Sequence, residues 1–447
     1  MSKIVVAALV LTATLNESAT AAIAVQIVPQ QQVPTRGAQG LLVPGHGATV
    51  TREVALEQLQ PLVRRGAPGD VVIYVSLPPP GKSHNVVRYP IAIVGGGYRG
   101  LIVDERTRLP GLVAIGSIEP TVEALERGES PPITSRADAN PRATLARLDD
   151  TLDEAHDART SASVVLGVLV FALVLPALWL RSAFLSRAAV LAIPATLALG
   201  LEVRSSAGLL VGGLVLALVL AWSARLFRPL LLATLVGALF VLWRWPETNA
   251  LATIGPHPDG GGRFYGLTNQ TSTLLLPTAL LAGLWSAPLA LLTVGWSKAG
   301  ADGGGVLTYA AGYAMLALRG YGRLTVRRVL LAAAGVALLG LLLVGVDAVT
   351  GGSSHVTRAV GTDLPGEVAH RWAVSARGAT RTWGAFTLFA VGVAILVRLS
   401  LLRPRPPALD AMLVALAVSL VVNDTPQDVA FWGAVGALGV LAVERTR

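Results

Sequence analysis

Polar clusters that could carry chemistry interrupt the apolar second half of the 447-residue chain. The first two lie at residues 260–273 and 298–305, and their polar members include Arg263, Tyr265, Asn269, Lys298 and Asp302. An arginine guanidinium is a charged fork that fits phosphate or carboxylate. Both clusters lead through glycines into an apolar run, and the N–H groups at the start of a helix attract anions. These residue types predict binding of an anionic group.

Two further clusters add groups that exchange protons. One contains Asp347, His355 and Arg358, and the other contains Asn423 and Asp424. Histidine titrates near neutral pH, so His355 or the nearby Asp347 is the best general base for an acceptor hydroxyl. Arginines would stabilise charge on a leaving phosphate. The predicted catalytic residues are Asp302, Asp347, His355 and Asp424, and the predicted substrate-binding residues are Arg263, Tyr265, Asn269, Lys298, Arg358 and Asn423.

A single cluster of this kind is better explained as a polar helix cap. Four clusters on one predicted side of a membrane favour a shared cavity instead, because ionisable groups near membrane segments tend to be functional. The sequence leaves the need for a metal ion or a cofactor open.

Apolar helices must position these clusters. The chain is 53% hydrophobic and only 14% charged, and its mean hydropathy is +0.61. Soluble domains carry about 25% charge, so an ordinary soluble enzyme is excluded. Eleven apolar runs have lengths near those that cross a bilayer; they lie at residues 163–180, 187–202, 206–222, 228–243, 270–284, 286–297, 304–318, 329–347, 383–399, 408–422 and 428–443. We predict a polytopic α-helical membrane protein with about 11 transmembrane helices over residues 163–443.

The N-terminus and the arginines predict the orientation. Residues 1–24 combine Lys3, an apolar run and Ala-Thr-Ala-Ala, which predicts a secretory signal peptide or an uncleaved signal anchor. The predicted inner segments carry thirteen basic residues against two acids, as the positive-inside rule requires. We expect the N-terminal domain and all four clusters outside the cytoplasm and residues 444–447 as a cytoplasmic tail. The net charge of +9 therefore reflects orientation and does not indicate nucleic-acid binding.

Residues 25–160 have the pattern of a small α/β domain on the extracytoplasmic side. Buried strands are expected at residues 41–43, 71–75, 91–94 and 112–115, and helices at 51–64, 119–127 and 141–158. Thr51 is the expected N-cap of the first helix. The acid-rich part of the last helix indicates a solvated face, with a metal site at Asp149, Asp153 and His156 as the alternative.

Several motifs resemble a known group of proteins. Gly40-Leu-Leu-Val-Pro-Gly-His-Gly-Ala-Thr-Val-Thr51 and Arg108-Leu-Pro-Gly-Leu-Val-Ala-Ile-Gly-Ser-Ile-Glu-Pro-Thr-Val-Glu-Ala-Leu125 are similar to segments of a largely uncharacterised bacterial multipass membrane protein family with an N-terminal alkaline-phosphatase-like domain. Arg-Phe-Tyr-Gly at residues 263–266 and Asp-Gly-Gly at 302–304 extend the resemblance over most of residues 40–443. It implies a location in the bacterial plasma membrane and no established reaction.

The resemblance also implies that the outer domain is degenerate. Active members of that superfamily need two metal sites and a Ser or Thr nucleophile. This chain has Glu105-Arg-Thr-Arg108 where the family has an Asp-His pair. The remaining candidate ligands are scattered, namely His46, His84, His156, Asp70 and Asp104. The domain is expected to be an inactive relative.

Three functions fit these observations. The leading hypothesis is an envelope protein that handles a lipid-linked or anionic precursor at its outer face, as a transferase acting on a polyprenyl-phosphate-linked group would. The alternative is a transporter or flippase for a lipid or envelope component, because short apolar segments beside glycines resemble the interrupted helices of transporters. The third is a non-catalytic scaffold that binds an envelope protein through residues 25–160.

Overall fold

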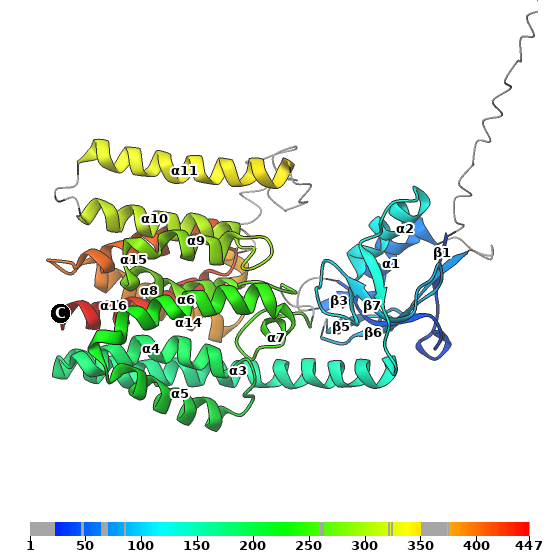
Figure 1. The fold of residues 1–447 in the computed structure, drawn as a ribbon, viewed down its shortest axis with the longest axis horizontal. Helices are drawn as coiled ribbons and strands as arrows, with labels where there is room; N and C mark the ends of the chain where they lie inside the picture. Colours follow the sequence, from blue (N-terminus) through cyan, green and yellow to red (C-terminus); the bar gives the residue numbers. More distant parts are fainter. Residues whose placement is uncertain are drawn as a thin grey trace, which may run out of the picture.

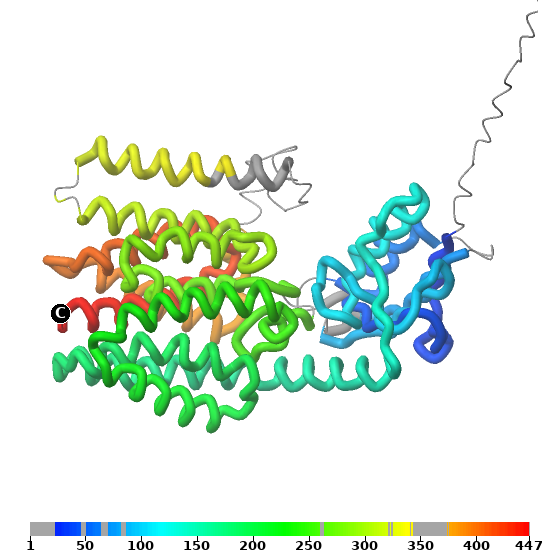
Figure 2. The backbone as a smooth tube through the Cα atoms, viewed as in Figure 1, coloured from blue at the N-terminus to red at the C-terminus, as the bar shows by residue number. Residues whose placement is uncertain are grey.

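The computed structural model describes residues 23–45, 49–63, 70–84, 86–259, 263–320, 322, 325–349, 373 and 375–446. They form an N-terminal domain built on a mixed sheet and a larger helical domain (Figure 1). The backbone trace shows that one long helix, α3, runs from the first domain into the second (Figure 2).

The sheet of the N-terminal domain has the order β1-β4-β6-β2-β7-β9, and β8 pairs with β2. The strands are β1 (Ile23–Ile27), β2 (Ala38–Val43), β4 (Val71–Val75), β6 (Tyr89–Gly95), β7 (Gly100–Asp104), β8 (Leu112–Ala114) and β9 (Ile133–Arg136); β3 (Thr49–Thr51) and β5 (Lys82–His84) form a separate pair. β1–β4 and β2–β7 are parallel, whereas β4–β6 and β2–β6 are antiparallel. The four predicted strands are present as parts of β2, β4, β6 and β8. Residues 23 and 24, the last two of the predicted leader of residues 1–24, belong to β1.

Two helices, α1 (Arg52–Leu59) and α2 (Ile118–Glu126), cover this sheet, and short 3-10 turns lie at Gln30–Gln32, Gln60–Leu62 and Ile115–Ser117. As predicted, Thr51 caps α1 by accepting a hydrogen bond from Val54 N–H. Ala55 and Leu59 of α1 and Ile118 of α2 are buried in the same apolar core as the strands. The helices thus bury the apolar face of the sheet, which is the main stabilising interaction of such a domain.

Helix α3 (Pro141–Leu180) is continuous for 40 residues, or about 60 Å. Asn140 caps its start. The predicted boundary between residues 160 and 163 therefore falls inside a helix. The backbone hydrogen bonds of α3 continue without a break from its acid-rich half into its apolar half. The acidic half is not simply a solvated face: Asp149 and Asp153 both form ion pairs with the buried Arg88. Both carboxylates of the alternative metal site are thus occupied by Arg88, and His156 is paired with Asp259 instead.

All eleven predicted apolar runs form helices of the second domain. These are the second half of α3, α4 (Ala183–Leu199), α5 (Ser206–Ala221), α6 (Phe227–Arg244), α8 (Asn269–Ala282), α9 (Ala287–Gly295), α10 (Gly303–Gly320), α11 (Val326–Val349), α14 (Trp383–Ser400), α15 (Pro407–Val422) and α16 (Pro426–Arg445); shorter elements are α7 (Pro246–Ala250) and the 3-10 turns Ala224–Leu226 and Leu284–Ser286.

Fewer helices than predicted meet the requirements for crossing a membrane. In the described residues, four are long and apolar enough: α3, the stretch Ala224–Arg244, α14 and α16. The number of about 11 is thus not confirmed, because several helices are short. The 14 residues of α8 reach about 21 Å, whereas the hydrocarbon core of a bilayer is about 30 Å thick.

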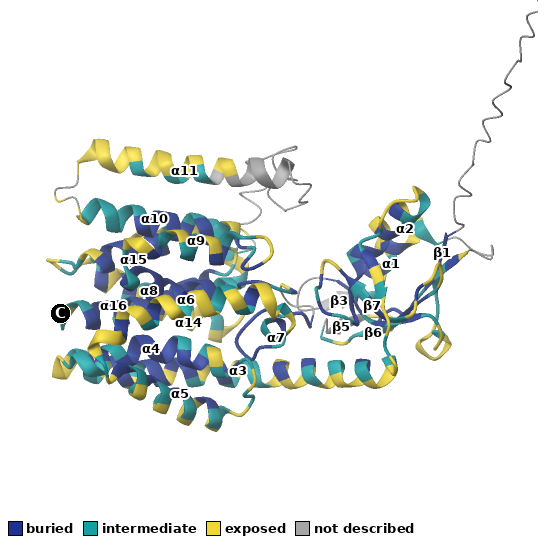
Figure 3. Cartoon of the chain, in the orientation of Figure 1, coloured by how far each residue is buried: buried dark blue, intermediate teal, exposed yellow. Residues whose placement is uncertain are grey.

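Exposed residues lie along the outward faces of these helices (Figure 3), and many of them are large and apolar. Trp222, Trp285 and Trp383 are more than four-fifths exposed. Apolar surface of this extent marks contact with a membrane or a partner.

The C-terminus lies at the end of the helical domain that is remote from the sheet domain (Figure 1). Asp410, a buried carboxylate near the start of α15, forms ion pairs there with Arg405 and with Arg319, whose Nε lies 3.0 Å from Asp410 Oδ2. Asp410, one of the two acids among the predicted inner segments, is therefore neutralised within the fold.

Candidate functional site

Three of the four polar clusters meet at the end of the helical domain that faces the sheet domain. The first two meet through Arg263. Its guanidinium donates to the carbonyl oxygens of Leu267 at 2.8 Å and Ala301 at 3.2 Å, and it lies 3.7 Å from Asp302 Oδ1. The Arg263 side chain is still 41% exposed, so part of the fork faces outward.

Asp302 lies in the loop before α10 and is buried. Its Oδ1 accepts the N–H of Gly305 at 3.0 Å, and the Ser272 side chain lies close enough to the carboxylate to lower its pKa; no described residue donates to Oδ2 with ordinary hydrogen-bond geometry. Burial raises the pKa of Asp302, and the charge of Arg263 opposes this effect. A buried acceptor without a donor is costly, so Asp302 is poised to accept a hydrogen bond or a proton from a ligand.

The fourth cluster joins the first two from the loop between α15 and α16. Asn269, at the start of α8, donates to Asp424 Oδ1 at 2.7 Å and to Thr425 Oγ1 at 2.9 Å. Asn423 lies so close to the start of α10 that a Cβ at Gly304 would be 2.3 Å from its Oδ1. The start of α8, the start of α10 and the α15–α16 loop therefore form one polar cluster, defined here by Arg263, Asn269, Asp302, Asn423 and Asp424.

Two predicted binding residues lie elsewhere. Tyr265 stacks under the guanidinium of Arg108, whose Cζ is 3.7 Å from the ring centre, and Arg108 also donates to Ser297 O at 3.0 Å. Tyr265 thus joins the two domains. Lys298 is exposed. Sequence reasoning missed this role of Tyr265 because Arg108 is more than 150 residues earlier in the chain.

The third predicted cluster stays a prediction. Asp347 belongs to α11, and its side chain lies outside the described part of the chain. His355 and Arg358 also lie outside the described residues.

A second polar group, which the sequence did not predict, anchors the loop that carries Arg263. Asp259 is buried and contacts two residues of α3: His156 Nδ1 at 2.6 Å and Arg159 NH1 at 3.2 Å. His257 follows α7 in the same loop, and its N–H donates to Arg263 O at 2.9 Å. The spacing of His156 and Arg159, which places them on one helix face, was the only available signal.

Burial and the surrounding charges shift the pKa of His257. Burial and the positive charge of Arg159 lower its pKa from 6.5 to about 4, against the attraction of Asp259. Arg159 holds the pKa of Asp259 below its ordinary value even though burial alone would raise it. At neutral pH the group therefore contains an ionised Asp259 and a neutral His257.

This arrangement predicts acid sensitivity. Between pH 6.5 and about 4 the unfolded chain binds more protons at His257 than the folded chain does, so stability falls as the pH is lowered. The slope is at most about 1.4 kcal/mol per pH unit. Stabilisation by Asp259, whose pKa is lowered, is lost only below its ordinary value and so outside this window. Melting temperatures measured at about pH 7 and about pH 5 should differ less in His257→Phe than in the wild type. An equal difference in both proteins would assign the acid sensitivity to other groups.

Apolar contacts hold the same loop against the sheet domain. Leu112 and Val43 of the sheet domain, Leu152 of α3, and Ala250 and Phe264 of the helical domain form one buried cluster. Phe264 adjoins Arg263 in the sequence, so the sheet domain helps to position the guanidinium.

The chain matches no protein-family model, no curated protein and no solved structure. Among the described residues, no group of three or more His, Asp and Glu side chains could hold a metal ion. The site is thus defined by its own chemistry: a partly exposed guanidinium, a buried carboxylate with an unused oxygen, and amides that fix their relative positions.

Proposed function

We propose that the chain is an integral membrane protein of the cell envelope, with the sheet domain and the polar cluster outside the cytoplasm. The exposed apolar faces of the helices and the four helices of sufficient length support insertion. The arginine-rich helix ends lie opposite the sheet domain, which fits the positive-inside rule. Shorter helices such as α8 then cross the bilayer only in part or where it is locally thin.

Within this orientation, we infer that the polar cluster handles an anionic, lipid-linked envelope precursor. The observation that carries this proposal is the convergence of Arg263, Asp302 and Asp424 from three separate segments at the end of the helical domain that faces the sheet domain. The outward part of the Arg263 fork suits a phosphate. The unused oxygen of Asp302 suits a hydroxyl or another donor on the same ligand.

A transferase-like reaction follows from these groups. A base, Asp302 or the predicted Asp347 or His355, takes the proton of an acceptor hydroxyl. The acceptor oxygen forms a bond to the transferred group while the bond between that group and the carrier phosphate breaks. The phosphate leaves with the electron pair, and Arg263, together with the predicted Arg358, stabilises its charge.

The lipids that remain bound after gentle purification test the proposal. We expect the wild type to retain an anionic lipid such as a polyprenyl phosphate, and Arg263→Ala to retain at least about tenfold less, because the loss of a charge-assisted contact costs about 1.5–3 kcal/mol. Mass spectrometry of the extracted lipids measures this ratio.

The matched control is Arg244→Ala, which removes an exposed arginine at the end of α6 on the same side of the domain. Because Arg263 also binds loop carbonyls, Arg263→Lys serves as a second variant that keeps the charge. Only bulk phospholipid in every sample would contradict the proposal.

One observation favours the alternative of a transporter or flippase. Helix α8 is short, its residues from Thr271 to Leu281 are buried, and its start lies in the polar cluster. Half-length buried helices whose ends face a binding site are typical of transport proteins. In liposomes, a transferase changes the lipid-linked probe covalently, whereas a flippase only moves it to the other leaflet.

For the sheet domain we propose an inactive, docking role. Asp104 accepts hydrogen bonds from Arg106 N–H, Ala114 N–H and Ser117 Oγ, so this acid serves the fold. His156, another candidate ligand of the domain, is paired with Asp259. Those contacts support an inactive domain, for which we propose, besides its packing against the Arg263 loop, the binding of an envelope partner through residues 25–160.

A further inference from the structure

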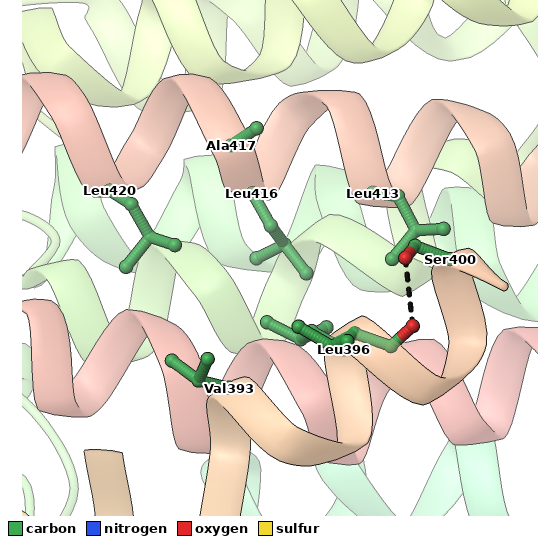
Figure 4. A pocket seen from close by; sticks show the side chains of 8 residues that line it. Val393, Leu396, Ser400, Leu413, Leu416, Ala417 and Leu420 are labelled. Carbon is green, nitrogen blue, oxygen red and sulfur yellow. Dashed lines mark hydrogen bonds between the residues drawn. The ribbon is translucent and has the colours of Figure 1, made fainter. Parts of the chain in front are cut away.

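An apolar groove lies between α14 and α15 (Figure 4). Its volume is about 230 Å³, and it is lined by Val393, Leu396, Val397, Ser400, Leu413, Leu416, Ala417 and Leu420. Ser400 is the one polar lining residue, and its hydroxyl donates to Val397 O within its own helix at 2.7 Å. The lining therefore presents hydrocarbon to whatever occupies the groove.

The dimensions of the groove fit a chain better than a helix. From Leu413 to Leu420 the groove follows α15 for about 10 Å, at 1.5 Å per residue. A helix segment of the same length is ~10 Å across and occupies more space than the groove offers. A cavity of about 150 Å³ already holds benzene, so several carbon units of a single chain fit.

The groove ends beside the polar cluster. Leu420 lies one helical turn before Asn423, and Asn269 binds the next residue, Asp424. Exposed apolar surface adjoins the groove, since the lining residue Val397 is 52% exposed and Val421, next to Leu420, is 55% exposed. In a bilayer, a lipid could therefore enter the groove sideways while its head group stays at the level of the cluster.

We propose that this groove binds one hydrocarbon chain of the lipid whose anionic head group is held at the polar cluster. The inference rests on the proposed function and narrows the ligand to a lipid that presents a single chain, as a polyprenyl carrier does. The bilayer is itself apolar, so the selectivity comes from van der Waals contact with the groove walls and not from the hydrophobic effect.

Photolabelling tests the proposal. The probe is a polyprenyl phosphate with a diazirine in its chain, offered to the full-length protein in phosphatidylcholine nanodiscs. In the wild type we expect labelling to concentrate on peptides of α14 and α15. Val393→Phe fills the groove and should lower that labelling about tenfold, which corresponds to 1.4 kcal/mol. The control Val391→Phe adds the same bulk at a 43% exposed position of the same helix and should leave the labelling unchanged.

The outcomes separate this proposal from the proposed function. Labelling spread evenly over all apolar helices, or equal labelling of Val393→Phe and Val391→Phe, overturns the groove proposal. If Arg263→Ala loses the lipid while Val393→Phe keeps it, the head-group site stands and the groove proposal fails. The reverse result overturns the head-group site and, with it, the proposal that one lipid occupies both the groove and the polar cluster. Leu420→Phe, which fills the groove from α15, must reproduce the loss seen with Val393→Phe.

Discussion

Asp259→Ala should expose the bond after Arg263 to protease. The substitution leaves Arg159 without its carboxylate in a site where Asp259 is only 2% and Arg159 15% exposed. Removing one partner of a buried ion pair costs about 3–5 kcal/mol, and we expect about 3 because His156 is partly exposed. The population of the open loop then rises about 100-fold. Trypsin, which cleaves after Arg263, measures that opening because cleavage follows the open population when reclosing is fast.

Asp157→Ala is the matched control, since Asp157 is an exposed acid on α3 next to His156. It should leave the cleavage rate unchanged. If Asp259→Ala and Asp157→Ala are cleaved equally slowly, the contact of Asp259 with α3 does not hold the loop that carries Arg263 in place. The consequence for function is direct, because the same loop carries Arg263 and receives its apolar support from the sheet domain.

The local sequence pattern was sufficient to predict where the helices of the second domain lie in the chain. Each predicted apolar run became a helix because burial or lipid contact of a long apolar segment leaves few alternatives to internal backbone hydrogen bonding. The strands β4 and β6 were predicted from short apolar runs, and their backbone groups pair with neighbouring strands. By contrast, β9 was not predicted. Its sequence, Ile-Thr-Ser-Arg, has no apolar pattern, and it forms a strand at the edge of the sheet because it pairs with β7.

Long-range contacts account for what was missed. Asp259 lies in a Pro-Asp-Gly sequence that is typical of an exposed turn. It is buried because α3, about a hundred residues earlier, presents His156 and Arg159 to it. The hydrogen bond between Asn269 and Asp424 is also a long-range contact. Nothing in the sequence around either residue indicates the other as its partner. The residue types at the site were predictable, whereas their partners were not.

Gly266→Ala should separate the two loops of the polar cluster that carry Arg263 and Asp302. Gly266 has a φ of +83°, and a Cβ there would lie 2.4 Å from the backbone oxygen of Gly300. A left-handed conformation costs a side chain about 1–2 kcal/mol, and overpacking typically costs 1–3 kcal/mol more. Backbone cannot move aside as a flexible side chain can. The two loops must therefore separate, which breaks the 2.9 Å hydrogen bond from Leu267 N–H to Gly300 O.

The separation also removes the carbonyls of Gly300 and Ala301 from Arg263, so the guanidinium loses its position beside Asp302. We expect Gly266→Ala to lower the free energy of unfolding by about 3 kcal/mol and to release the bound anionic lipid. Gly303→Ala is the control, because a Cβ at Gly303 meets no atom within 4 Å. Thermal unfolding in detergent and lipid analysis of both variants measure the two effects. Lipid retained by a destabilised Gly266→Ala protein would mean that the ligand does not depend on the contact between these loops.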